Sequence, residues 1–177
     1  MFDCFSWIND NLALISAFGV LLGAVVALRQ WAERIKIQRA EFVKELIEKL
    51  RFDPAVTEAG YMVDHGQFKC AANFYDPSNK HVEMQIDKYL SYLSYLCYLI
   101  ETRSVTKREM QLFEYKLVRT LRSPAVQTYL WNLVHFSKKF KINCSFHNLV
   151  VYGIKREVIG KDFLTNDKDR FTKILTF

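Results

Sequence analysis

The first long feature of the chain is a run of apolar residues without any charge, LALISAFGVLLGAVVAL, over Leu12–Leu28. As a helix this run is about 26 Å long, slightly less than the hydrocarbon core of a bilayer, which is about 30 Å thick. Trp7 and Trp31 flank it and suit the two interfacial belts. A cleaved signal peptide would begin with basic residues, whereas this chain begins with Asp3 and Asp10. The pattern therefore predicts a transmembrane helix over 12–28.

Basic residues lie on only one side of this run. All 25 lysines and arginines follow Leu28. Those closest behind the run are Arg29, Arg34, Lys36 and Arg39. The positive-inside rule then predicts a single-pass protein of the inner (cytoplasmic) membrane, with residues 1–11 outside and residues 29–160 as a cytoplasmic domain. The basic cluster and the two tryptophans are expected at the membrane surface, where each cation near anionic headgroups contributes about 1 kcal/mol.

Small residues recur within the apolar run. Gly19, Gly23 and Ala27 are spaced by four and therefore share one face of a helix. Such spacing lets two membrane helices approach closely, which predicts a homo-oligomer. The alternative is that glycine and alanine are simply frequent in membrane helices.

Apolar positions continue at helical spacing beyond the basic cluster, so we expect the helix to extend into the cytoplasmic domain. Asp53 followed by Pro54 predicts a helix end and a new start, with Asp53 as the N-cap and Pro54 at the first position. Residues 66–80 show no periodicity and predict a long loop with a turn at 76–79.

The segment 81–103 contains the run YLSYLSYLCYLI, in which tyrosines and leucines each recur every three residues. Its tyrosines are Tyr89, Tyr92, Tyr95 and Tyr98. Rows with that spacing wind around a helix, so the segment is apolar on nearly all sides and is expected in the core. The alternative is a membrane-inserting segment or second span at 89–100, although the uncharged stretch between Lys88 and Glu101 is short for a crossing.

Three more helices follow in the pattern, so the predicted fold is mostly α, a transmembrane helix continuing into a cytoplasmic helical bundle. Thr106 and Glu109 have the spacing of a capping box at the start of the first of these helices. Ser123-Pro124 restarts the pattern. A last helix is expected over 147–159, with a short strand at 150–152 as the alternative, and residues 161–177 are expected to form a polar tail.

No catalytic signature stands out. The sequence has no Gly-rich phosphate loop, GxSxG elbow or HExxH motif, and its cysteines form no CxxC pair. Cys144 and His147 have a local metal-like spacing without a second pair, and Asp64-His65 places a carboxylate beside an imidazole. We therefore expect that the protein is not an enzyme and that it binds no cofactor, metal or small-molecule substrate.

Basic residues with aromatic neighbours are the candidates for phosphate contacts. They are Lys107, Arg108, Lys116, Arg119 and Arg122. Such residues can bind nucleic acid. The favoured interpretation is that they form the solvent face of an amphipathic helix.

The order of these features resembles a bacterial family of membrane-anchored helical proteins associated with mobile elements, and the small transmembrane effectors of retrons. The residues that carry the resemblance are the runs 12–28, RAEFVKEL at 39–46 and 86–121, within about residues 8–150. The resemblance implies a non-enzymatic effector in anti-phage defence, silenced by a reverse transcriptase–nucleic acid complex and damaging the membrane when released. Retron effectors of this type have two spans, and here only the run 89–100 is available as a second. The competing hypothesis is a passive tether or scaffold that recruits a cytoplasmic partner.

Overall fold

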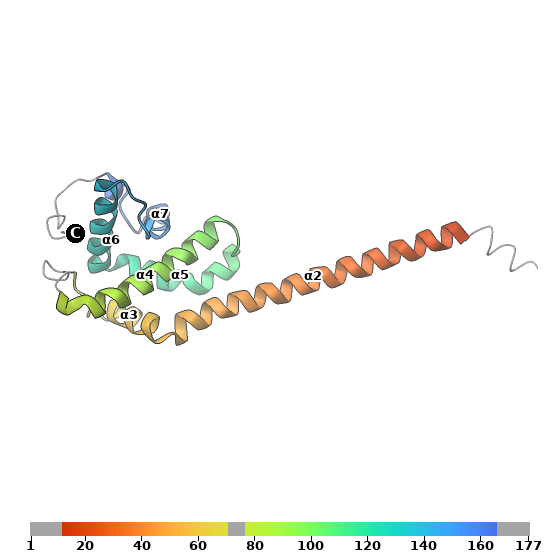
Figure 1. The fold of residues 1–177 in the computed structure, drawn as a ribbon, viewed down its shortest axis with the longest axis horizontal. Helices are drawn as coiled ribbons and strands as arrows, with labels where there is room; N and C mark the ends of the chain where they lie inside the picture. Colours follow the sequence, from red (N-terminus) through yellow and green to blue (C-terminus); the bar gives the residue numbers. More distant parts are fainter. Residues whose placement is uncertain (1–11, 71–76, 166–177) are drawn as a thin grey trace, which may run out of the picture. The chain divides into compact units, whose positions relative to one another are not determined.

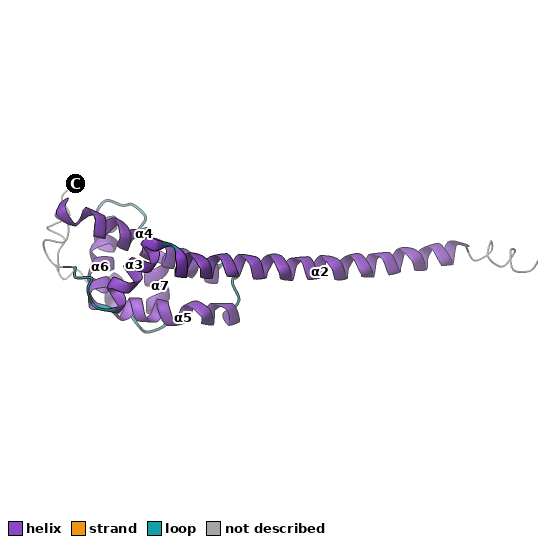
Figure 2. Ribbon diagram, turned by 90° about the horizontal axis from the view of Figure 1, so that it is seen from below, coloured by secondary structure: helices purple, strands orange, loops and turns teal. Residues whose placement is uncertain are grey.

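The computed structural model describes residues 12–70 and 77–165. Within these ranges the chain forms six α-helices and two short 3₁₀ turns, and no strand (Figure 2). The predicted fold class, mostly α, is confirmed at this level. The predictions for residues 1–11, including Trp7, for 71–76 and for 166–177 lie outside the described residues.

The chain divides into two compact units, residues 1–44 and 45–177. The described part of the first unit belongs entirely to helix α2 (Leu12–Phe52), the long helix coloured red to orange in Figure 1. The predicted continuation of this helix past residue 28 is confirmed. Across the described part of the chain, no helix is both long enough and apolar enough to traverse a bilayer.

Helix α3 (Pro54–Asp64) begins as the sequence predicts. Asp53 is the N-cap, and its Oδ1 accepts hydrogen bonds from the amide of Ala55 at 3.1 Å and of Val56 at 3.4 Å. Pro54 stands at the first helical position, where the missing N–H has no intrahelical acceptor in any case. A single residue thus separates α2 from α3.

Helix α4 (Lys80–Glu101), preceded by a 3₁₀ turn η1 (Pro77–Asn79), is the central helix of the second unit and packs against α3 and α7 (Figure 1). The side chains of Ile86, Tyr89 and Leu93 are fully buried. The prediction of a core helix over the Tyr/Leu-rich run is confirmed. Burial is not uniform around the axis, however, because Tyr95 and Tyr98 are about half exposed.

Helices α5 (Lys107–Arg122), α6 (Pro124–Lys139) and α7 (His147–Lys155) complete the unit. The capping box of α5 is present: Thr106 Oγ1 accepts from the Glu109 amide at 3.3 Å, and the Glu109 carboxylate accepts from the Thr106 amide at 2.7 Å. Residues 150–152 are helical, so the alternative of a strand there is wrong. After α7 a 3₁₀ turn, η2 (Lys161–Leu164), packs on α6 with Phe163 buried, although these residues belong to the expected tail.

Two hydroxyl groups of the core, those of Tyr89 and Ser94, find partners on neighbouring segments. Tyr89 Oη lies 2.6 Å from Thr120 Oγ1, which joins α4 to α5. Ser94 Oγ donates to the carbonyl of Ser145 at 3.0 Å and thereby fixes α4 against the start of α7. Since an unpaired buried hydroxyl costs about 1–3 kcal/mol, these bonds restrict the register in which the helices pack.

Candidate functional site

The first candidate surface is the N-terminal half of α2. Every residue from Ser16 to Gln38 is exposed, including Phe18 at 65% and Val20 at 73% of their full accessible surface. A β-carbon added to Gly19 or Gly23 would meet no atom within 4 Å, so the predicted association face is open. Ala27 lies on the same open stretch. Apolar side chains such as Phe18 and Val20 are therefore exposed on all sides of this part of the helix.

The predicted membrane-surface residues follow this stretch on the same helix. Arg29, Trp31, Arg34 and Lys36 are exposed, and Arg39 is half-buried. Arg29 forms an i,i+4 ion pair with Glu33, with the two charged atoms 3.7 Å apart. At 100° per residue, Arg29, Lys36 and Arg39 lie within about 80° of one another around the axis, whereas Arg34 lies on the opposite side of the helix.

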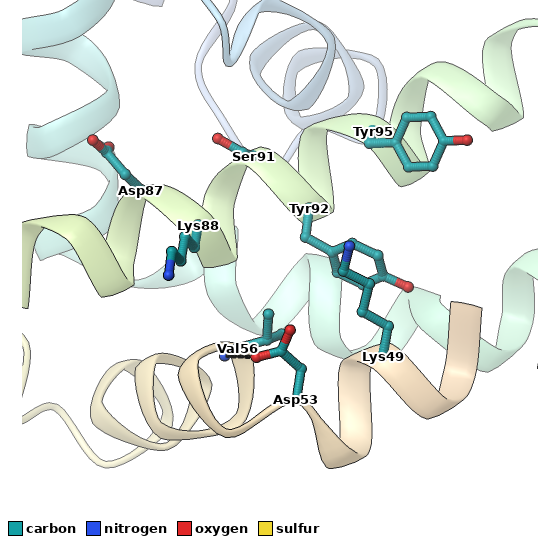
Figure 3. Close-up of a pocket in the computed structure, with 8 residues that line it drawn as sticks. All are labelled: Lys49, Asp53, Val56, Asp87, Lys88, Ser91, Tyr92 and Tyr95. Atoms are coloured by element: carbon teal, nitrogen blue, oxygen red, sulfur yellow. Dashed lines mark hydrogen bonds between the residues drawn. The ribbon is translucent and has the colours of Figure 1, made fainter. Parts of the chain in front are cut away.

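A groove of about 580 Å³ lies in the second unit between the end of α2, α3 and α4 (Figure 3). Its lining residues are Lys49, Asp53, Val56, Asp87, Lys88, Ser91, Tyr92 and Tyr95. Figure 3 shows Lys88 extending from α4 toward α3, and Lys49 extending from the end of α2 toward Tyr92. Asp87 and Ser91 point to the other side of α4 in the same view.

The acidic groups of this groove are engaged in holding the fold. Asp53 caps α3, and Asp87 Oδ1 accepts a hydrogen bond from the buried Tyr129 hydroxyl at 2.6 Å. Burial raises the pKa of Asp87 above its ordinary value, and the bond from Tyr129 opposes that effect. Glu83, one turn before Asp87, also has a raised pKa, first from burial and then from repulsion by Asp87.

The cationic groups are less engaged. The Lys49 ammonium lies 5.6 Å from the centre of the Tyr92 ring. Lys88 forms no ion pair or hydrogen bond within residues 12–70 and 77–165. The groove can therefore accept an anionic group between two ammonium ions, with aromatic side chains on one wall. The groove could not be predicted from the sequence, because its lining residues come from three helices.

A second groove, of about 590 Å³, contains Cys144 and His147, the pair with metal-like spacing. Its wall also includes Val134, Ile142 and Leu164. Burial raises the pKa of the Cys144 thiol, so the neutral form is favoured. The described residues contain no group of three or more side chains placed to hold a metal ion.

The remaining polar candidates are separated by the fold. The Asp64 carboxylate lies between Lys116 and Arg119 of α5, with Arg119 Nε 3.1 Å from Oδ1. The His65 ring packs on Tyr61 with ring centres 4.0 Å apart. The imidazole and the carboxylate therefore serve different contacts, and two of the five basic residues considered for phosphate binding already share one carboxylate.

The tyrosines of α4 also divide. Tyr89 and Tyr92 are buried, and Tyr92 donates its hydroxyl hydrogen to the carbonyl of Leu46. Tyr95 and Tyr98 are half exposed, and Tyr95 lines the same groove as Tyr92. The four predicted membrane-inserting side chains therefore do not form one surface in this structure.

The chain matches no protein-family model, and neither a curated protein nor a solved structure shows significant similarity to it.

Proposed function

We propose that the protein is a non-enzymatic, membrane-anchored effector whose N-terminal helix enters the bilayer. The observation that carries this proposal is the exposure of α2 on all sides over an uncharged stretch, from Ser16 to Leu28. A helix that is apolar all round requires an apolar surrounding on every side, either lipid or other protein. An amphipathic helix lying on a membrane would instead show a charged face in this stretch.

The proposed anchor is the uncharged run Leu12–Leu28, and flanking residues make up the small difference between its length and the thickness of a bilayer. Trp7 would then mark the outer interface, and Trp31 with the basic cluster would mark the cytoplasmic one. Copies of the chain would associate through Gly19, Gly23 and Ala27, whose face is open. The effector role, in anti-phage defence under control of a nucleoprotein partner such as a reverse transcriptase complex, rests on the resemblance of the sequence.

Two measurements test this proposal. Full-length protein expressed in bacteria should pellet with membranes and resist alkaline carbonate extraction, and its induction should depolarise the cells. Recovery of the full-length protein in the supernatant after ultracentrifugation without detergent would refute the anchor. Normal growth and membrane potential on induction would refute the effector role.

The association face has its own test. Replacing Gly19 and Gly23 together with leucine should abolish depolarisation while leaving the protein in the membrane. Ala17→Leu is the matched control, because Ala17 is also exposed but lies on another side of the helix. Undiminished toxicity of the glycine variant would remove self-association from the proposal.

The groove in Figure 3 favours a second candidate, a tether that recruits an acidic partner to the membrane. Lys88 is the test position, because its ammonium group extends toward this groove and is unpaired among the described residues. Lys88→Glu should then abolish co-purification of a specific partner with the detergent-extracted full chain. Lys80→Glu, outside the groove, should not. Capture of the same partner by both variants would exclude the groove.

A further inference from the structure

The turn between α6 and α7 exposes two large apolar side chains. Phe140 is 51% exposed and Ile142 is 56% exposed. Three lysines alternate with them in the sequence KKFKI, at 138, 139 and 141. Isolated exposed apolar residues are ordinary, but two of them in one tight turn with three cations need an explanation.

The backbone of this turn is well defined. The amide of Ile142 donates to the carbonyl of Ser137 at 2.9 Å and the amide of Lys141 donates to the carbonyl of Lys138 at 3.1 Å. Lys141 adopts the left-handed conformation, with φ of 54°. This is a Schellman motif, in which the residue after the left-handed position usually packs back on the helix it terminates. Ile142 holds that position and is nevertheless largely exposed.

Helix α7 ends in the same motif and provides an internal comparison. Glu157 is left-handed with φ of 57°, and the amide of Val158 donates to the carbonyl of Gly153 at 2.9 Å. Val158, in the position equivalent to Ile142, is half-buried. The motif itself therefore does not force its apolar residue into solvent.

Phe140 is held in place. Its ring packs on Phe136 with centres 4.5 Å apart, and the Lys139 ammonium lies 5.8 Å from the Phe140 ring centre. Because the contact with Phe136 already fixes the position of this ring, its transfer from water into an apolar medium costs little side-chain entropy.

The charge around the turn has one sign over a long stretch of sequence. No aspartate or glutamate occurs between Glu114 and Glu157. Lys138 donates a hydrogen bond to the carbonyl of Leu164, whereas the ammonium groups of Lys139 and Lys141 form no ion pair or hydrogen bond in the part of the chain that the structure describes. The surface is complementary to closely spaced anions that border an apolar phase.

We propose that the turn 138–142 docks on an anionic lipid surface, with Phe140 and Ile142 entering the headgroup–acyl boundary and Lys139 and Lys141 binding lipid phosphates. Nucleic acid would satisfy the lysines but would leave the aliphatic side chain of Ile142 in water, so a lipid surface fits both kinds of residue. This contact goes beyond the proposed anchor, because it uses residues of the second unit and does not require α2 to cross the membrane.

The test places a reporter in the turn of the full-length protein. Phe140→Trp protein is reconstituted into phosphatidylcholine vesicles with or without phosphatidylglycerol, and quenching by doxyl-labelled lipids is compared with the wild-type background. Quenching at position 140 should appear only with the anionic lipid and should weaken with added salt. Leu112→Trp is the matched control, because Leu112 is exposed to a similar degree, at 59%, on α5; it should show no such quenching.

A flotation assay keeps the inference separate from the anchor. If the full-length protein does not insert, it should still float with anionic vesicles, and replacing Lys139 and Lys141 with glutamine should weaken binding about fivefold per lysine, equivalent to about 1 kcal/mol each. Equal access of water-soluble quenchers to position 140 in neutral and anionic vesicles would overturn the proposal. So would protection of position 140 by a single-stranded oligonucleotide without protection by lipid.

Discussion

The ends of three helices give a stability prediction with an internal control. Helices α3, α6 and α7 each end next to a left-handed residue: Gly66 with φ of 66°, Lys141 with 54° and Glu157 with 57°. A side chain in this conformation costs about 1–2 kcal/mol, whereas glycine loses about 0.5–1 kcal/mol more backbone entropy on folding. Lys141→Gly and Glu157→Gly should therefore each raise the free energy of unfolding by about 0.5–1 kcal/mol. Gly66→Ala should lower it by a similar amount.

Urea denaturation of the full-length protein, followed by circular dichroism, measures these changes. The two glycine variants should be additive, because the turns after α6 and α7 share no backbone hydrogen bond. A loss of stability in both, or no loss in Gly66→Ala, would show that these backbone conformations do not govern the helix ends. Lys141→Gly and Glu157→Gly also distinguish an effect on stability from an effect on lipid binding. Lys141→Gly should stabilise the protein and still weaken its binding to anionic vesicles, whereas Glu157→Gly should only stabilise it.

Three other substitutions test the packing of the second unit. Asp87→Asn should be more stable than wild type at neutral pH. The raised pKa of Asp87 gives stability that is complete below the ordinary pKa of 3.8 and is lost as pH rises through the raised pKa. Measuring the difference in unfolding free energy against pH checks this, and a less stable variant at neutral pH would contradict it. Gly153→Ala should lower the free energy of unfolding by about 1 kcal/mol, because the added β-carbon would lie 2.6 Å from Ile159 Cδ1 and this crowding outweighs the better helix propensity of alanine. Adding Ile159→Val should recover part of the loss in thermal unfolding. Asp64→Ala should lower the free energy of unfolding by about 1–2 kcal/mol, because it removes a carboxylate shared by two cations of α5. This difference should shrink in high salt. An unchanged midpoint of unfolding would show that these ion pairs contribute nothing to stability.

The features that sequence reasoning placed correctly are local. Asp53 and Pro54 specify a helix start because the cap bonds reach only two and three residues ahead. The reciprocal bonds of Thr106 and Glu109 have the same short range. Such signals do not depend on the rest of the fold, so one sequence is enough to read them.

The features that it missed depend on contacts between distant residues. The repeat in the Tyr/Leu run does not distinguish Tyr92, which is buried, from Tyr95, which is half exposed, because the neighbouring helices decide which side is covered. The groove in Figure 3 likewise joins Lys49 to Lys88 from different helices. The exposure of Phe140 likewise becomes visible in the structure alone.

The two proposed lipid contacts would reinforce each other. The turn is a weak binder by itself, with two partly exposed apolar side chains and two lysines that form no ion pair among the described residues and are worth about 1 kcal/mol each at an anionic surface. A second contact on an anchored chain is intramolecular, however, and its effective lipid concentration is set by the tether and not by the amount of lipid added. A contact that holds a free protein only weakly can therefore remain occupied once α2 is inserted. Substitutions in the turn should then change vesicle binding strongly when the anchor is impaired, for example by charges within Leu12–Leu28, and only slightly when it is intact. Equal effects in both backgrounds would mean that the two contacts are not coupled through one membrane.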